Sequence, residues 1–122
     1  MRLAGIAAVL SALALGGGGA ARAHHSHAMF DTSKELTLKG TVTNVSYRNP
    51  HVFLYVDVMG EKGDVLSWAI EMSNISNMER RGIYRSTFKP GDIVVVTINP
   101  LKDGRRGGNY TAITAADGKS YN

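Results

Sequence analysis

Histidine is the residue type in this chain with the clearest capacity for chemistry, because imidazole nitrogens bind transition metals. The 122 residues include four histidines, and three of them, His24, His25 and His27, lie within four consecutive positions. The fourth, His51, ends the segment Asn49-Pro50-His51. What the clustered histidines can bind depends on how close they lie to the N-terminus of the processed chain.

Residues 1–23 have the pattern of a cleavable signal peptide. Met1-Arg2 is a short positive start, an apolar run extends from Leu3 to Leu15, and Ala21-Arg22-Ala23 supplies the small residues that a signal peptidase needs. The apolar run is too short to cross a hydrocarbon layer of ~30 Å as a helix. We therefore predict cleavage after Ala23, a periplasmic or secreted protein, and no membrane span in the processed chain.

Cleavage after Ala23 would make His24 the first residue. Its α-amino nitrogen and its own Nδ1 can then chelate one metal ion, and a second imidazole from His25, His27 or His51 completes a set of three nitrogens that suits Cu(II). Cleavage after Ala21 would place His24 third from the free amine, which is a different square-planar chelate for Cu(II) or Ni(II). Copper is the first metal predicted and zinc the second. The alternative is a polar tail that binds metals adventitiously.

Composition narrows the other functions. The chain has no cysteine, so its stability must come from a hydrophobic core, which about 100 residues can form. Removal of Arg2 and Arg22 with the leader lowers the net charge from +4 to +2, which does not favour nucleic-acid binding. We find no nucleophile elbow, phosphate loop or HExxH pattern, and we do not predict an enzyme.

Hydrophobic alternation divides the processed chain into a His-rich arm, residues 24–34, and one β domain, residues 35–122. Strands are predicted at 36–45, 51–59, 65–72, 93–98 and 110–115, with a loop at 99–108 and no strand after 115. Asn74 and Gly82 suit the two ends of one short helix. Gly40 predicts a bulge or a sharp bend in the first strand. The order β-β-β-α-β-β predicts an all-β fold with one short helix, a small five-stranded Greek-key barrel of the oligonucleotide/oligosaccharide-binding (OB) type.

The second predicted strand has two different faces. Its aliphatic residues, Val52, Leu54, Val56 and Val58, are expected to face the core. Phe53 and Tyr55 then point outward with His51, and Glu71 faces the same way from the third strand. Strands two and three form the usual ligand face of OB barrels. Phe53, Tyr55 and Glu71 are therefore the predicted ligand face, for a periplasmic partner protein or glycan. The alternative is that the helix or the arm simply covers these aromatic residues.

A set of short motifs spans the processed chain. They are, in order, Ala23-His24-His25-Ser26, Met29-Phe30-Asp31, Leu38-Lys39-Gly40-Thr41-Val42, Asn49-Pro50-His51, Trp68, Arg80-Arg81-Gly82, Lys89-Pro90-Gly91-Asp92, Asp103-Gly104 and Asp117-Gly118. In this combination the chain resembles a family of short exported bacterial proteins that is defined as a domain of unknown function. The resemblance implies a secreted or periplasmic β-rich protein and assigns it no activity.

Overall fold

A computed structural model describes residues 27–122 of the protein, with the backbone alone described for His27. The predicted leader, His24 and His25 lie outside the described residues. The elements are a short 3-10 turn, η1 (His27–Met29), strands β1 (Leu36–Ser46), β2 (Phe53–Met59) and β3 (Val65–Glu71), helix α1 (Ile75–Arg80), and strands β4 (Ile93–Pro100), β5 (Gly107–Ala115) and β6 (Ser120–Tyr121).

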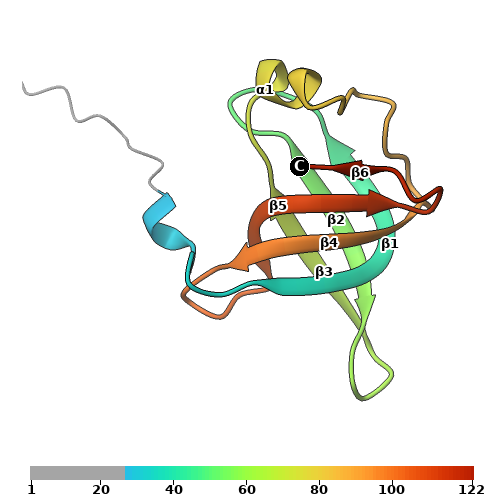
Figure 1. Cartoon of the computed structure of the whole chain (residues 1–122). Coiled ribbons are helices and arrows are strands. Elements are labelled where there is room, and N and C mark those ends of the chain that lie inside the picture. Colours follow the sequence, from blue (N-terminus) through green and yellow to red (C-terminus); the bar gives the residue numbers. More distant parts are fainter. Residues whose placement is uncertain (1–26) are drawn as a thin grey trace, which may run out of the picture.

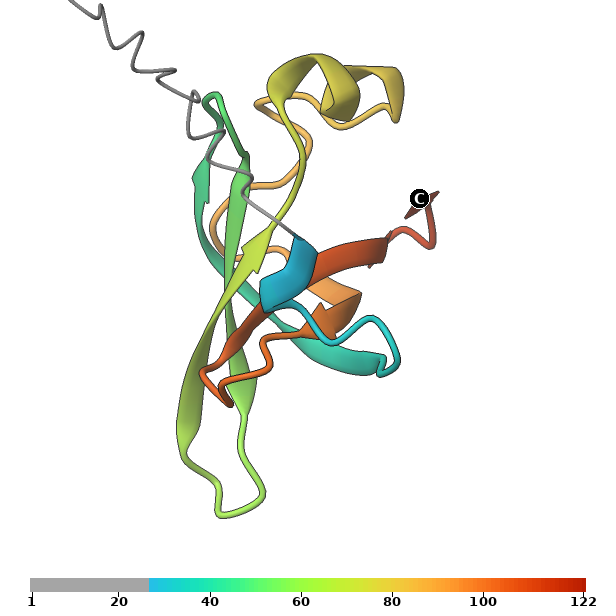
Figure 2. The ribbon, with the colours of Figure 1, turned by 90° about the vertical axis from the view of Figure 1, so that its left-hand side faces the viewer.

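Strands β1 to β5 close into a barrel. Antiparallel pairing runs in the order β3-β2-β1-β4-β5, and a parallel contact between β3 and β5 closes the ring. Helix α1 connects β3 to β4 and lies at one end of the barrel, whereas the β2–β3 hairpin projects from the other end (Figures 1 and 2). This connectivity is that of an OB-type barrel. The predicted all-β fold class is therefore confirmed.

Strand β1 bends at Gly40, which allows it to serve two partners. Its first half pairs with β4 over Leu36–Thr41, and its second half pairs with β2 from Gly40 onward. A Cβ atom at Gly40 would lie 2.4 Å from the carbonyl oxygen of Asp57. The strands can approach this closely only because residue 40 has no side chain. The predicted bend is confirmed, while the irregularity in register falls later, between Val42 and Asn44.

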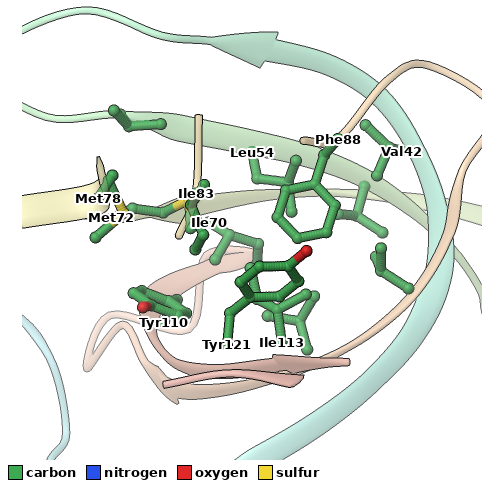
Figure 3. Close-up of a cluster of buried hydrophobic side chains, with 14 of the residues drawn as sticks. Val42, Leu54, Ile70, Met72, Met78, Ile83, Phe88, Tyr110, Ile113 and Tyr121 are labelled. Atoms are coloured by element: carbon green, nitrogen blue, oxygen red, sulfur yellow. The ribbon is translucent and has the colours of Figure 1, made fainter. Parts of the chain in front are cut away.

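The core combines aliphatic side chains with two methionines and the rings of Phe88, Tyr110 and Tyr121 (Figure 3). Val52, Leu54 and Val56 are buried and Val58 is partly buried against the core, which confirms the core face predicted for the second strand. Tyr121 of β6 packs edge-on against Phe88, with ring centroids 5.5 Å apart. This packing must hold the barrel together, because the chain has no cysteine to form a disulfide bond.

Helix α1 begins and ends where its sequence predicts. The side-chain oxygen of Asn74 accepts a hydrogen bond from the backbone N–H of Asn77 at 2.8 Å, which satisfies a donor that the helix itself cannot. Gly82 follows the helix with a φ of 80°, a conformation that glycine adopts without strain. Between these ends, Met78 is completely buried and fastens the helix to the barrel core.

Two predictions about the end of the chain were wrong. The loop predicted at 99–108 is too long, because β4 continues to Pro100 and β5 already begins at Gly107, which leaves only residues 101–106 between them. Glycine is depleted in strands, but here Gly107 and Gly108 allow neighbouring backbones to approach closely. In addition, the strand predicted at 110–115 is followed by β6, which pairs with β5 at Ile113 and Thr114. Two residues are too few to show alternation.

Candidate functional site

A cavity of about 400 Å³ lies beside the turn between β1 and β2. Three residues singled out from the sequence, His51, Phe53 and Glu71, line it together. The rest of its lining comes from the same turn and from the arm: Met29, Ser46, Arg48, Asn49 and Pro50. The cavity therefore combines an imidazole, a carboxylate, a guanidinium, a thioether and an aromatic ring.

The turn that carries His51 is held at both of its ends. The side-chain oxygen of Asn49 accepts a hydrogen bond from the backbone N–H of Ile75 at 2.9 Å, which joins the turn to the start of α1. The Tyr47 hydroxyl donates to the carbonyl of Ile83 at 2.9 Å, and burial raises the pKa of this hydroxyl above its usual value. Val52, directly after His51, exchanges backbone hydrogen bonds with the segment that follows β3. His51 consequently occupies a defined place next to β3.

His51 and Glu71 form the polar centre of the cavity. The Nδ1 atom of His51 lies 2.9 Å from Oε1 of Glu71, and the two side chains are 29% and 19% exposed. An ionised carboxylate accepts hydrogen bonds and does not donate them, so Nδ1 carries the hydrogen of this contact. A carboxylate that orients an imidazole in this way is the usual support of a histidine metal ligand.

The arm reaches the barrel at this same cavity. The backbone N–H of Lys102 donates to the carbonyl of Met29 at 3.0 Å, and the N–H of Asp31 donates to the carbonyl of Pro100 at 2.8 Å. Phe30, between these two contacts, is buried and bridges to Leu101. The cyan segment that leads from η1 into β1 therefore runs beside the orange β4–β5 loop (Figure 1). The last part of the arm is thus attached to the barrel.

A second set of contacts fixes the path from the arm into β1. The amide of Asn99 donates to the carbonyl of Lys34 at 2.8 Å. Asp31 accepts from both the hydroxyl and the backbone N–H of Ser33, at 2.6 Å and 3.1 Å. The hydroxyl hydrogen bond is the main reason that the pKa of Asp31 lies below its ordinary value. This local turn leads the chain away from the cavity and toward the start of β1.

Tyr55 follows the cavity residue Phe53 by two positions in β2 and does not line the cavity. Its ring stacks on Phe53 with centroids 6.1 Å apart and an angle of 20° between the rings. Both rings are on the outer face of the β2–β3 pair, where Phe53 is opposite Glu71 and Tyr55 is opposite Ala69. The predicted ligand face thus divides into a polar cavity at Phe53 and Glu71 and an aromatic extension at Tyr55.

The predicted metal ligands are distributed differently. His51 lines the cavity, the side chain of His27 is not described, and His24 and His25 lie outside the described residues. Within the described part of the chain, no three His, Asp or Glu side chains gather closely enough to hold a metal ion. His51 with Glu71 alone is therefore an incomplete ligand set.

Met29, Ser46 and Arg48 line the cavity but were not singled out as site residues from the sequence. Arg48 directly precedes the segment Asn49-Pro50-His51, so its position next to the cavity could have been inferred. Met29 carried no such signal, because its place depends on contacts between the arm and the β4–β5 loop. These contacts join residues about 70 positions apart in sequence.

The fold and the cavity together define a class: a small closed β-barrel with a polar cavity beside its first turn and an arm attached at that cavity. The chain belongs to DUF6152, a family of unknown function whose sequence profile matches residues 12–111. The predicted resemblance to a domain of unknown function is therefore confirmed. A search of curated proteins finds no match. Among residues 27–122, no helix is both long enough and apolar enough to cross a membrane.

Proposed function

We propose that the protein is exported and holds a transition metal without catalysis, copper in the first place and zinc in the second, through His24, His25, His27 and His51. One observation supports this proposal above the others. The cavity that contains the His51–Glu71 pair is also lined by Met29, which follows His27 by only two residues. His27 is therefore close in sequence to a residue that lines the cavity of the fourth histidine.

The chemistry of the ligand set favours copper. Export and cleavage after Ala23 would give His24 a free α-amine, so that its amine and imidazole chelate the ion and the imidazole of His51 can supply a third nitrogen. Nitrogen ligands of this kind bind Cu(II) more strongly than the other divalent first-row metals. Glu71 would orient His51 and increase the basicity of its ring. The proposal thus includes a leader at residues 1–23 and a periplasmic or secreted location.

The protein should be tested with the N-terminus that the cell gives it. We would express it with its own leader, determine the intact mass, and titrate Cu(II) and Zn(II) against a competing chelator. We expect a chain that starts at His24 and binds one Cu(II) with a dissociation constant below a micromolar, about −8 kcal/mol or better. Weak binding of several ions per chain, as by any His-rich tail, would overturn the proposal.

The stacked rings of Phe53 and Tyr55 favour a second function, an interaction module for a periplasmic glycan or protein. Both rings are partly exposed on the outer face of β2. Tyrosine is enriched at interfaces because it joins an apolar ring to a polar hydroxyl, and Phe53 extends the apolar surface beside it. This function would need no metal and would leave the arm without a role in binding.

A sedimentation assay with purified peptidoglycan tests the glycan form of this second function. We expect the Phe53→Ala, Tyr55→Ala double variant to lose sedimentation, because it removes the whole stacking surface. Tyr84→Ala is the matched control, since Tyr84 is 54% exposed but lies outside this face. Circular dichroism should show that the double variant remains folded. Equal sedimentation of wild type and double variant would reject a glycan module on this face.

A further inference from the structure

The methionines of the described chain divide into two kinds. Met72 and Met78 are buried in the core, at 2% and 0% exposure. Met29 and Met59 are exposed, at 44% and 70%. Met59 is in the projecting β2–β3 hairpin, whereas Met29 lines the cavity of His51 and Glu71. Met29 contributes little to the core, so packing does not explain why a methionine lies at the cavity of His51.

The backbone of Met29 is held firmly although its side chain is exposed. Its carbonyl accepts the hydrogen bond from Lys102, and the next residue, Phe30, is 6% exposed and bridges to Leu101. The arm is therefore anchored at the residue whose side chain faces the cavity. A fixed Cα with a flexible, unbranched side chain suits a ligand that must adapt to an ion.

A thioether and an imidazole have different preferences among metals. Imidazole binds copper in either oxidation state, whereas the soft thioether sulfur selects Cu(I). Arg48 lines the same cavity and is positively charged. Its repulsion of an ion is proportional to the charge of that ion, so it opposes Cu(II) more than Cu(I). Both features favour the lower oxidation state.

We propose that Met29 is a Cu(I) ligand in the cavity of His51, so that one site accepts copper in both oxidation states. This inference rests on the proposed function, because it assumes that copper enters this cavity. It concerns binding alone: His51 with the arm histidines serves Cu(II), and Met29 joins His51 when the ion is Cu(I). A protein of this kind would bind copper whether it is supplied as Cu(I) or as Cu(II).

The experiment compares Met29→Leu with Met59→Leu, a matched change at the other exposed methionine. Leucine has nearly the same volume and lacks the sulfur, so both variants should fold. Cu(I) affinity is measured without oxygen against a colorimetric Cu(I) chelator, and Cu(II) affinity is measured in air. We expect Met29→Leu to weaken Cu(I) binding by about tenfold or more, comparable to the loss of a partner in a metal site. Both affinities of Met59→Leu should stay unchanged, and the Cu(II) affinity of Met29→Leu should fall by much less than its Cu(I) affinity.

X-ray absorption at the copper edge supplies a second readout. The chain has no cysteine, so a sulfur neighbour of Cu(I) must be a methionine of this protein. We expect that neighbour in wild type and in Met59→Leu, and its absence in Met29→Leu. If the Cu(I) affinity and the sulfur signal of Met29→Leu equalled those of the wild type, this inference would be wrong. The proposed function would still stand if the wild type bound Cu(II). Failure of the wild type to bind Cu(II) would instead count against the proposed function.

Discussion

We expect the His51→Ala variant to bind Cu(II) at least about 100-fold more weakly than the wild type, because loss of a proposed metal ligand should exceed the 10- to 100-fold loss typical of a supporting residue. The change removes a partly exposed side chain from the end of a turn, so the barrel core is left intact. The measurement is a competition titration on protein that has been processed at its own N-terminus, with the melting temperature of each variant recorded beside it.

Three companion variants show which groups form the site. Glu71→Gln keeps an oxygen that can accept from His51 Nδ1 but removes its charge, so its affinity should fall between those of His51→Ala and the wild type. The His24→Ala, His25→Ala double variant should lose tight binding altogether. Glu61→Gln, an exposed change in the β2–β3 hairpin, should have no effect.

Two results would contradict this arrangement. If His51→Ala and Glu71→Gln bound Cu(II) like the wild type while the double arm variant lost it, the arm would chelate copper alone and the cavity would have no part in the site. If the double arm variant kept full affinity, the histidine cluster would not be the metal site. In the first case the shared cavity of Met29 and His51 would be a packing feature of the arm.

We expect Gly40→Ala to lower the free energy of unfolding by about 3 kcal/mol or more, at the upper end of the range for overpacking. The new Cβ would lie 2.4 Å from the carbonyl oxygen of Asp57 and 2.6 Å from a methyl carbon of Val56. The oxygen belongs to the backbone of β2, and β1 is held at this residue by β4 as well, so neither strand can move away alone.

Urea denaturation followed by circular dichroism measures this loss. Thr41→Ala is the control, because Thr41 is the exposed neighbour in the same strand and its truncation introduces no clash. A surface change of this kind should stay within about 0.5 kcal/mol of the wild type. A Gly40→Ala protein with the same midpoint as Thr41→Ala would show that β1 and β2 are not packed as closely as the bend requires.

Local pattern was enough to predict most of the barrel. The alternation of Val52, Leu54 and Val56 identified the core face of β2, because every second side chain of a strand points the same way. Asn74 and Gly82 located the ends of α1 through hydrogen bonding and backbone conformation within a few residues of the helix. The same logic could not find β6 or the true ends of β4 and β5. The bounds of these strands depend on which other strand lies next to them. Gly107 and Gly108 matter there because they let the neighbouring backbone approach closely.

The candidate site divides along the same line. By itself the sequence determined the histidine cluster and the common side of Phe53 and Glu71, since these follow from order along the chain and from strand periodicity. Only the tertiary structure decided that His51 pairs with Glu71 and that Met29 lies at their cavity. Those contacts depend on the β2–β3 register and on the attachment of the arm to the β4–β5 loop. Contacts between distant parts of a chain are set by packing and loop closure, which leave no periodic signal in the sequence.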